Sequence, residues 1–175
     1  MEFIETSIEG AYLIENIKEF DSRGYFQRIF CQKEFDGTSL SDVFVQTSAS
    51  YNEKKYTLRG MHYQIEPFAE SKLIFCTRGS FYDVIVDLRA DSPTFKVWYS
   101  VILDESLGYS LYVPPGCAHG FLTLEPKTFV FYQISQYHSK ECERGFKWND
   151  PSLNIDWPHP PLEISNRDMN LPFIY

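Results

Sequence analysis

The chain has 175 residues, of which 17% are aromatic, and a formal net charge of −8. This length suits one domain spanning residues 1–175, and an acidic chain without a lysine or arginine run lacks the clustered cations that nucleic-acid binding needs. No apolar stretch approaches the roughly 18 residues of a membrane span, and the acidic N-terminus lacks a secretory apolar core. We therefore expect neither nucleic acid nor membrane as a partner.

Short β-rich runs recur along the chain between turn signals, and their prolines sit in the turns, as ladder hydrogen bonding requires. This spacing is typical of an antiparallel barrel or jelly roll, and we predict an all-β fold with a few short helices. The predicted strands cover residues 11–15, 43–47, 72–77, 81–87, 95–103, 110–113 and 128–134.

One helix start is predicted near the C-terminus. Ser165 is placed as its N-cap, with Asp168 at the third helical position, so the carboxylate would have a defined orientation. The four cysteines are scattered and form no Cys-x-x-Cys pair. This favours a reduced, cytoplasmic protein.

Four histidines are candidates for chemistry. His62 follows Arg59 and a flexible turn residue, Gly60, whereas His119 lies at the entry to a strand. The surroundings of His138 and His159 are polar or proline-rich, as on a surface. Small β-barrels often hold a metal through a His-x-His pair, but Gln64 stands two residues after His62, and amide oxygens are poor ligands for zinc or iron.

Other common chemistries lack their signatures. The sequence contains no Gly-x-Ser-x-Gly turn, no phosphate-binding Gly-x-x-x-x-Gly-Lys loop and no dinucleotide fingerprint. Proton transfer remains, with a histidine as base, a carboxylate to orient it and a phenol as acid.

Six segments in the same order resemble the dTDP-4-dehydrorhamnose 3,5-epimerases over nearly the full length of the chain. They are residues 21–26, 59–64, 83–89, 92–95, 114–121 and 148–151. The resemblance implies a cupin-like jelly roll, a homodimer with strand exchange, and no metal or other cofactor. It implies a substrate in which a nucleotide diphosphate carries a 4-keto-6-deoxyhexose, as in surface-polysaccharide or antibiotic sugar synthesis.

The resemblance also implies roles for individual residues. His62 matches the base, Asp168 the carboxylate paired with it, and Tyr132 the acid on the opposite face. Lys72 matches a residue beside the sugar ketone and diphosphate, and Arg59 a phosphate contact. Arg23, Phe26 and Gln46 match positions that receive the nucleotide, some of them reaching in from the partner subunit. We also expect Arg28, His119 and His138 to bind the substrate.

Elementary chemistry agrees with these roles. Removing a proton next to a ketone leaves an enolate, and stabilising that oxyanion is typically worth about 2.7–4 kcal/mol. Lys72 is the natural donor. Imidazole, with an ordinary pKa of about 6.5, is a competent base near neutrality. Arg23 and Arg59 supply guanidinium groups for a diphosphate.

Two positions depart from the family pattern. Arg28 stands where the family usually has a glutamate that can accept the N3 proton of thymine; arginine can only donate, which makes CDP an alternative nucleotide. His138 follows an aromatic residue where the family tends to have tyrosine, which leaves open inversion at C3, at C5 or at both. Two other functions are alternatives: a cupin-type 3,4-ketoisomerase, and a non-catalytic sugar-nucleotide-binding cupin.

Overall fold

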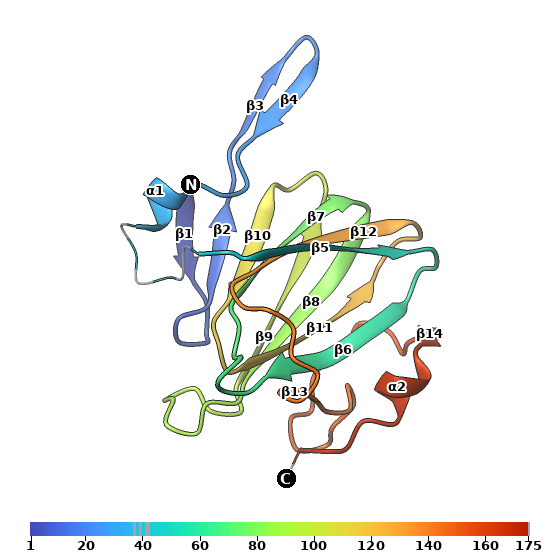
Figure 1. The fold of residues 1–175 in the computed structure, drawn as a ribbon. Coiled ribbons are helices and arrows are strands. Elements are labelled where there is room, and N and C mark those ends of the chain that lie inside the picture. Colours follow the sequence, from blue (N-terminus) through green and yellow to red (C-terminus); the bar gives the residue numbers. More distant parts are fainter. Residues whose placement is uncertain (37, 39, 41–42, 175) are drawn as a thin grey trace.

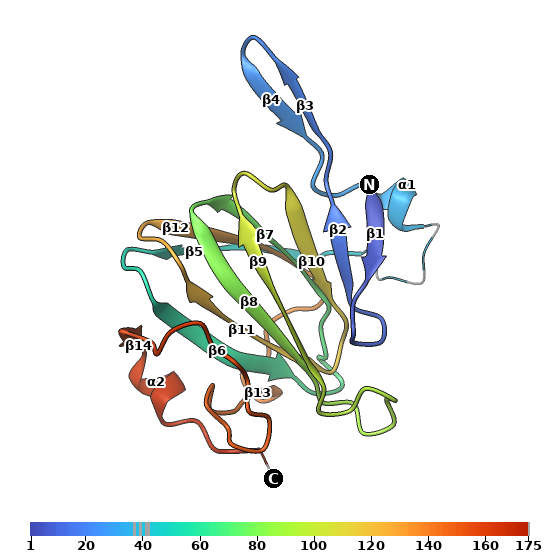
Figure 2. The ribbon, with the colours of Figure 1, turned by 180° about the vertical axis from the view of Figure 1, so that it is seen from behind.

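Two β-sheets made of strands from distant parts of the chain enclose the core (Figures 1 and 2). The computed structural model describes residues 1–36, 38, 40 and 43–174. The strands of the first sheet, in spatial order, are β1 (Glu2–Glu5), β2 (Tyr12–Glu15), β10 (Tyr109–Val113), β7 (Lys72–Arg78), β12 (Thr128–Ile134) and β5 (Gln46–Asn52). Those of the second are β13 (Glu143–Gly145), β6 (Thr57–Gln64), β11 (Cys117–Thr123), β8 (Ser80–Asp87) and β9 (Trp98–Asp104).

Three short elements lie beside these strands. β14 (Glu163–Ile164) runs parallel to β6, and α2 (Asn166–Met169) follows it directly. α1 (Gln32–Phe35) packs Phe35 into the core beside the first sheet. Among the described residues, no helix has the length and apolar character needed to cross a membrane. The all-β prediction with a few short helices is confirmed.

The main core lies between the two sheets. The first sheet contributes Ile74, Leu111 and Val130, and the second contributes Phe81 and Phe121, all of them at most 2% exposed. A second cluster covers the outer face of the second sheet, where Met61 and Val84 meet Phe146 from the C-terminal segment. The second sheet is therefore packed on both faces, and this holds β6 and β11 in place.

Most predicted strands match observed ones, and the match at residues 128–134 is complete. The prediction for 43–47 is wrong at both ends, since β5 runs Gln46–Asn52. The prediction that a strand begins at residue 95 is also wrong, because Ser92 and Thr94 donate hydrogen bonds to the buried carboxylate of Asp87 and form a turn there. β6 has no predicted counterpart, because Arg59, Gly60 and His62 interrupt its apolar pattern.

A two-stranded hairpin of β3 (Lys18–Asp21) and β4 (Gly24–Gln27) extends away from both sheets (Figure 1). Its apolar side chains are exposed to solvent, with Phe20 at 75% and Phe26 at 66%. Arg23, at the turn, forms an ion pair with Asp21, and its side chain is also exposed. Large exposed apolar side chains on an isolated arm suit contact with another protein surface.

Candidate active site

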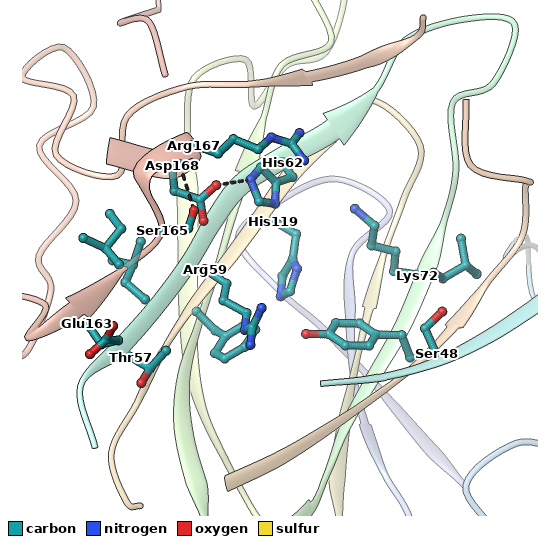
Figure 3. Close-up of a pocket in the computed structure, with 15 residues that line it drawn as sticks. Ser48, Thr57, Arg59, His62, Lys72, His119, Glu163, Ser165, Arg167 and Asp168 are labelled. Carbon is teal, nitrogen blue, oxygen red and sulfur yellow. Dashed lines mark hydrogen bonds and ion pairs between the residues drawn. The ribbon is translucent and has the colours of Figure 1, made fainter. Parts of the chain in front are cut away.

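A cavity of about 550 Å³ opens between the two sheets and under the C-terminal segment (Figure 3). β6 and β11 line one side, β12 and the start of β7 the other, and α2 covers one edge. Six of the candidate residues line it, and they come from five elements. Its polar lining residues are Ser48, Thr57, Arg59, His62, Lys72, His119, Tyr132, Glu163, Ser165, Arg167 and Asp168.

An irregularity at Gly60 turns both Arg59 and His62 toward this cavity. In a regular strand, residues three apart point to opposite faces. Here the register between β6 and β11 shifts next to Gly60. Met61 packs into the outer cluster, whereas Arg59 and His62 on either side of it both line the cavity. Gly60 is thus a mid-strand residue, and the prediction that it forms a turn is wrong.

Only glycine fits at this point. Gly60 has φ +115°, and an added Cβ would lie 2.6 Å from the Cα of Gly120 on β11. We expect Gly60→Ala to lower the free energy of unfolding by about 3 kcal/mol, the sum of a positive-φ cost of roughly 1–2 and an overlap cost of roughly 1–3. Gly24→Ala is the matched control, because Gly24 has φ +131° with nothing within 4 Å of its Cβ. Denaturant melts of both proteins measure the difference, and equal losses would contradict this account.

His62 and Asp168 form a hydrogen-bonded pair at the edge of the cavity (Figure 3), with Nε2 and Oδ1 separated by 2.7 Å. The backbone N–H of Gly60 donates to the other carboxylate oxygen at 3.2 Å. Ser165 caps α2 by accepting the Asp168 N–H at 3.0 Å, which confirms the predicted cap.

The protonation of this pair is set by its contacts. Burial by itself would raise the pKa of Asp168, but the hydrogen bonds from His62 and Gly60 hold it below its ordinary value. The ionised carboxylate therefore accepts the Nε2 proton of His62, and Nδ1 carries the lone pair that can act as a base. Because its pKa is lowered, Asp168 stays ionised throughout the neutral range, and this orientation persists there.

Tyr132 faces the cavity from the opposite sheet. Its neighbour Val130 is buried in the same core, while Phe131 packs against Phe75 on the outer face, so the predicted alternation is confirmed. Burial raises the pKa of Tyr132 well above its ordinary value, and the nearby Asp83 adds to the effect. The phenol is therefore protonated, as a proton donor requires.

His119 and Asp83 form a second, more deeply buried pair, with Nε2 and Oδ1 separated by 2.5 Å. Burial raises the pKa of Asp83, and the charge and hydrogen bond of His119 oppose this. The ring of His119 lies 6.1 Å from that of Tyr132. Asp83 is not among the predicted site residues, although a carboxylate inside the apolar run 81–87 signals a residue that needs a buried partner.

Lys72 enters the cavity at the beginning of β7 and makes an ion pair with Glu70, 2.9 Å from Nζ to Oε1. Arg59 is held by Asn52, which accepts from its Nε at 2.8 Å. Arg167, which is also missing from the predicted set, lines the cavity beside Asp168 and bonds to Glu143. Its position next to the predicted carboxylate is the only sequence signal that could have found it.

A smaller cavity of about 150 Å³ adjoins the first, because His62 and Lys72 line both. It is lined by two further predicted residues, Gln46 and His138, and the Gln46 side chain accepts the backbone N–H of His138 at 3.0 Å. The structure does not bring the other predicted binding residues to either cavity within one chain. Arg23 and Phe26 lie on the projecting hairpin, and Arg28 lies just beyond it.

The amide of Gln64 is occupied by backbone groups. It donates to the carbonyl oxygens of Phe68 and Tyr137 and accepts the N–H of Ser139. Within the described part of the chain, no three His, Cys, Asp or Glu side chains are arranged to hold a metal ion. The hydrogen bonds of Gln64 therefore hold the surrounding loops in place. Gln64 lies two residues after His62, which faces the cavity.

Known proteins share this fold and much of this sequence. The family model described as dTDP-4-dehydrorhamnose 3,5-epimerase matches residues 5–175. A Sinorhizobium fredii protein of that name is 41% identical over 173 residues, which cover 98% of this chain and 89% of that protein. The crystal structure of such an epimerase from Bacillus anthracis, with TDP and PPi bound, has a TM-score of 0.95 at 42% identity and covers 99% of each chain.

A third relative was solved with a sugar nucleotide. The dTDP-6-deoxy-D-glucose-3,5-epimerase of Legionella pneumophila, in complex with dTDP-4-keto-L-rhamnose, has a TM-score of 0.91 at 34% identity and covers 98% of this chain and 92% of that one. These names specify dTDP or TDP, which corrects the CDP alternative drawn from Arg28. In the structure the Arg28 guanidinium lies 3.3 Å from Glu34, so it already has an acidic partner in its own chain.

The family match, the identities and the shared fold all extend over nearly the whole chain. The chain therefore belongs to the dTDP-4-dehydrorhamnose 3,5-epimerase family.

Proposed function

We propose that this protein is an epimerase that inverts C3 and C5 of a dTDP-linked 4-keto-6-deoxyhexose. One observation carries the proposal: His62 on β6 and Tyr132 on β12 line the same cavity from opposite sheets. A sugar ring between them would present one face to a base and the other to an acid. Inversion of a carbon next to a ketone needs that arrangement.

The reaction consists of two proton transfers at each centre. Nδ1 of His62 takes the proton from the carbon beside the ketone. The C–H electron pair forms a double bond to C4, and the carbonyl electron pair moves onto the C4 oxygen, which gives an enolate. Asp168 stabilises the imidazolium that forms, and Lys72 stabilises the enolate oxygen. Tyr132 then delivers its phenolic proton to the opposite face of the carbon. C3 and C5 both flank the C4 ketone. Once solvent has taken the proton from the imidazolium and returned one to the phenolate, the same groups can serve the other centre.

The cations of the cavity suit the nucleotide end of such a substrate. Arg59 and Lys72 line it directly, and guanidinium and ammonium groups are the usual partners of a diphosphate. These local charges offset the overall acidity of the chain. Gln46 and His138, in the adjoining smaller cavity, continue this binding surface toward the nucleoside.

A homodimer completes the site in this proposal. The hairpin β3–β4 carries Arg23 and Phe26 away from its own cavity and exposes Phe20. We place this arm across the cavity of a second copy, where it would contact the nucleotide. Sedimentation of the protein and of a variant without residues 18–27 checks the arrangement: the proposal expects a dimer that becomes a monomer with weakened substrate binding.

The reaction is assigned to one domain, residues 1–175, working in the cytoplasm. All four cysteines lie in the described part of the chain as free thiols. Burial raises the pKa of Cys76 and Cys117 to about 12, which keeps both thiols protonated and unreactive. Free, unreactive thiols suit a reducing compartment.

Incubation with dTDP-4-keto-6-deoxy-D-glucose in heavy water tests the proposed function. We expect deuterium at C3 and C5 and a product whose NMR couplings show inversion at both positions. Deuterium uptake at one carbon alone would restrict the activity to a single centre. Tight binding without any exchange would overturn the proposal in favour of a binding protein.

The activity is expected to resist chelators. Gln64 occupies the position of a second metal ligand, and backbone groups saturate its amide. After prolonged dialysis against EDTA, the rate of epimerisation should stay within experimental error of the untreated enzyme. Loss of activity that zinc or iron restored would contradict this prediction.

A further inference from the structure

Glu70 is a buried carboxylate in the wall of the smaller cavity, and the proposed reaction gives it no part. The residue is 7% exposed. One oxygen, Oε1, lies 2.9 Å from Nζ of Lys72, whose side chain is 13% exposed. The other oxygen, Oε2, is buried and has no hydrogen-bond partner among the described residues. Removing a carboxylate from water is unfavourable, so stability alone does not account for this ion pair.

The backbone places the two charges side by side. Residues two apart in an extended segment point to the same face, and Glu70 and Lys72 flank Ser71 at the beginning of β7. Ser71 donates its N–H to Oγ of Ser135 at 2.8 Å and accepts the N–H of Ser135 at 3.1 Å. These bonds extend the pairing of β7 with β12 by one position. Glu70 is thus held on a fixed segment of chain.

Lys72 must be charged to do what the proposed function asks of it. Burial favours the neutral form of a lysine, whereas a carboxylate at hydrogen-bond distance favours the charged form. An ammonium group has three N–H donors. With one donated to Glu70, its direction is set and two remain for the substrate.

We infer that Glu70 is a positioning residue, which fixes the direction of the Lys72 ammonium toward the enolate and diphosphate of the substrate. The inference rests on the proposed function for its consequence, but the ion pair itself does not depend on it. Other titratable or charged groups surround Lys72 in the two cavities or influence it through space. They are Arg59, His62, Tyr63, Asp83, Cys117, His119, Tyr132, His138, Glu143, Glu163, Arg167 and Asp168.

Glu70→Gln keeps the shape of the side chain and removes its charge. We expect the Lys72 ammonium to lose its fixed direction, so that the NMR signal of its ε-carbon shifts. NMR of protein labelled with ¹³C at the lysine ε-carbons measures this directly, and Lys72→Met assigns the signal. Glu70→Asp retains the charge and should leave the signal close to its wild-type position. Glu70→Ala, which removes both charge and shape, should shift the signal at least as far as Glu70→Gln.

The loss of direction is also expected in the kinetics. In Glu70→Gln the misdirected ammonium should lower kcat/KM by about 10-fold or more. Glu66→Gln is the matched control, because Glu66 is exposed on the same loop and the charge change is identical. In a Lys72→Met background, where there is no ammonium to direct, Glu70→Gln should lower kcat/KM no further.

An unchanged Lys72 ε-carbon signal in both Glu70→Gln and Glu70→Ala would overturn the inference. So would an equal loss of kcat/KM from Glu70→Gln with lysine or methionine at position 72, because Glu70 would then act on another group. The NMR measurement needs no turnover. A protein that failed to epimerise the sugar would therefore contradict the proposed function. The NMR measurement would still decide whether Glu70 positions Lys72.

Discussion

His62→Ala is expected to lower kcat by about 100-fold or more, the usual range for loss of a general base. The imidazole is the group on β6 that is both oriented by a carboxylate and directed into the cavity. Its side chain is 31% exposed, so truncation creates no buried void and the fold should survive. Steady-state kinetics with circular dichroism of the same samples measures both effects.

A matched control removes another histidine. His159 stacks on Tyr56 with ring centroids 3.8 Å apart, outside the residues that line the cavity, so His159→Ala should keep the wild-type rate. Asp168→Asn should slow the reaction by a smaller factor than His62→Ala, because the base remains but loses its orientation and the partner of its cation. A near-native rate in folded His62→Ala would remove His62 from the role of base.

Tyr132→Phe is expected to separate the two halves of the reaction. Without the phenol, His62 can still form the enolate and return a proton to the face it came from. Solvent deuterium then enters next to the ketone with retained configuration, so exchange persists while inversion falls by about 100-fold, as for loss of a general acid. The ring packs against the main core, and phenylalanine keeps that packing, so stability should change little.

Both rates are measured on one sample in heavy water, exchange by loss of the proton signal and inversion by appearance of the new stereoisomer. Tyr109→Phe is the matched control, since Tyr109 packs against the same core and does not line the cavity. It should leave both rates unchanged. Equal losses of exchange and inversion in Tyr132→Phe would show that the phenol does not act as the second proton carrier.

Local sequence patterns determined several parts of the site correctly. Alternation over 128–134 separated the cavity-facing Tyr132 from the outward Phe131, because a strand reverses its side chains at every residue. The Ser165 cap and the position of Asp168 followed from the first turn of a single helix. Such signals act over a few residues, so they can be read without knowing how the sheets are arranged. The family resemblance supplied the roles of the residues, and the shared fold and identities confirmed the family.

Tertiary structure alone decided how these parts meet. His62 and Asp168 are 106 positions apart in the sequence. Their side chains form a hydrogen bond because α2 packs against β6. The direction of Arg59 depends on the approach of Gly120 to Gly60, a contact between strands that neither segment encodes by itself. The burial of Asp83 beside His119 likewise comes from pairing β8 with β11. Periodicity describes which face a residue occupies on a regular strand, whereas the catalytic cavity arises where that regularity breaks and two sheets close over it.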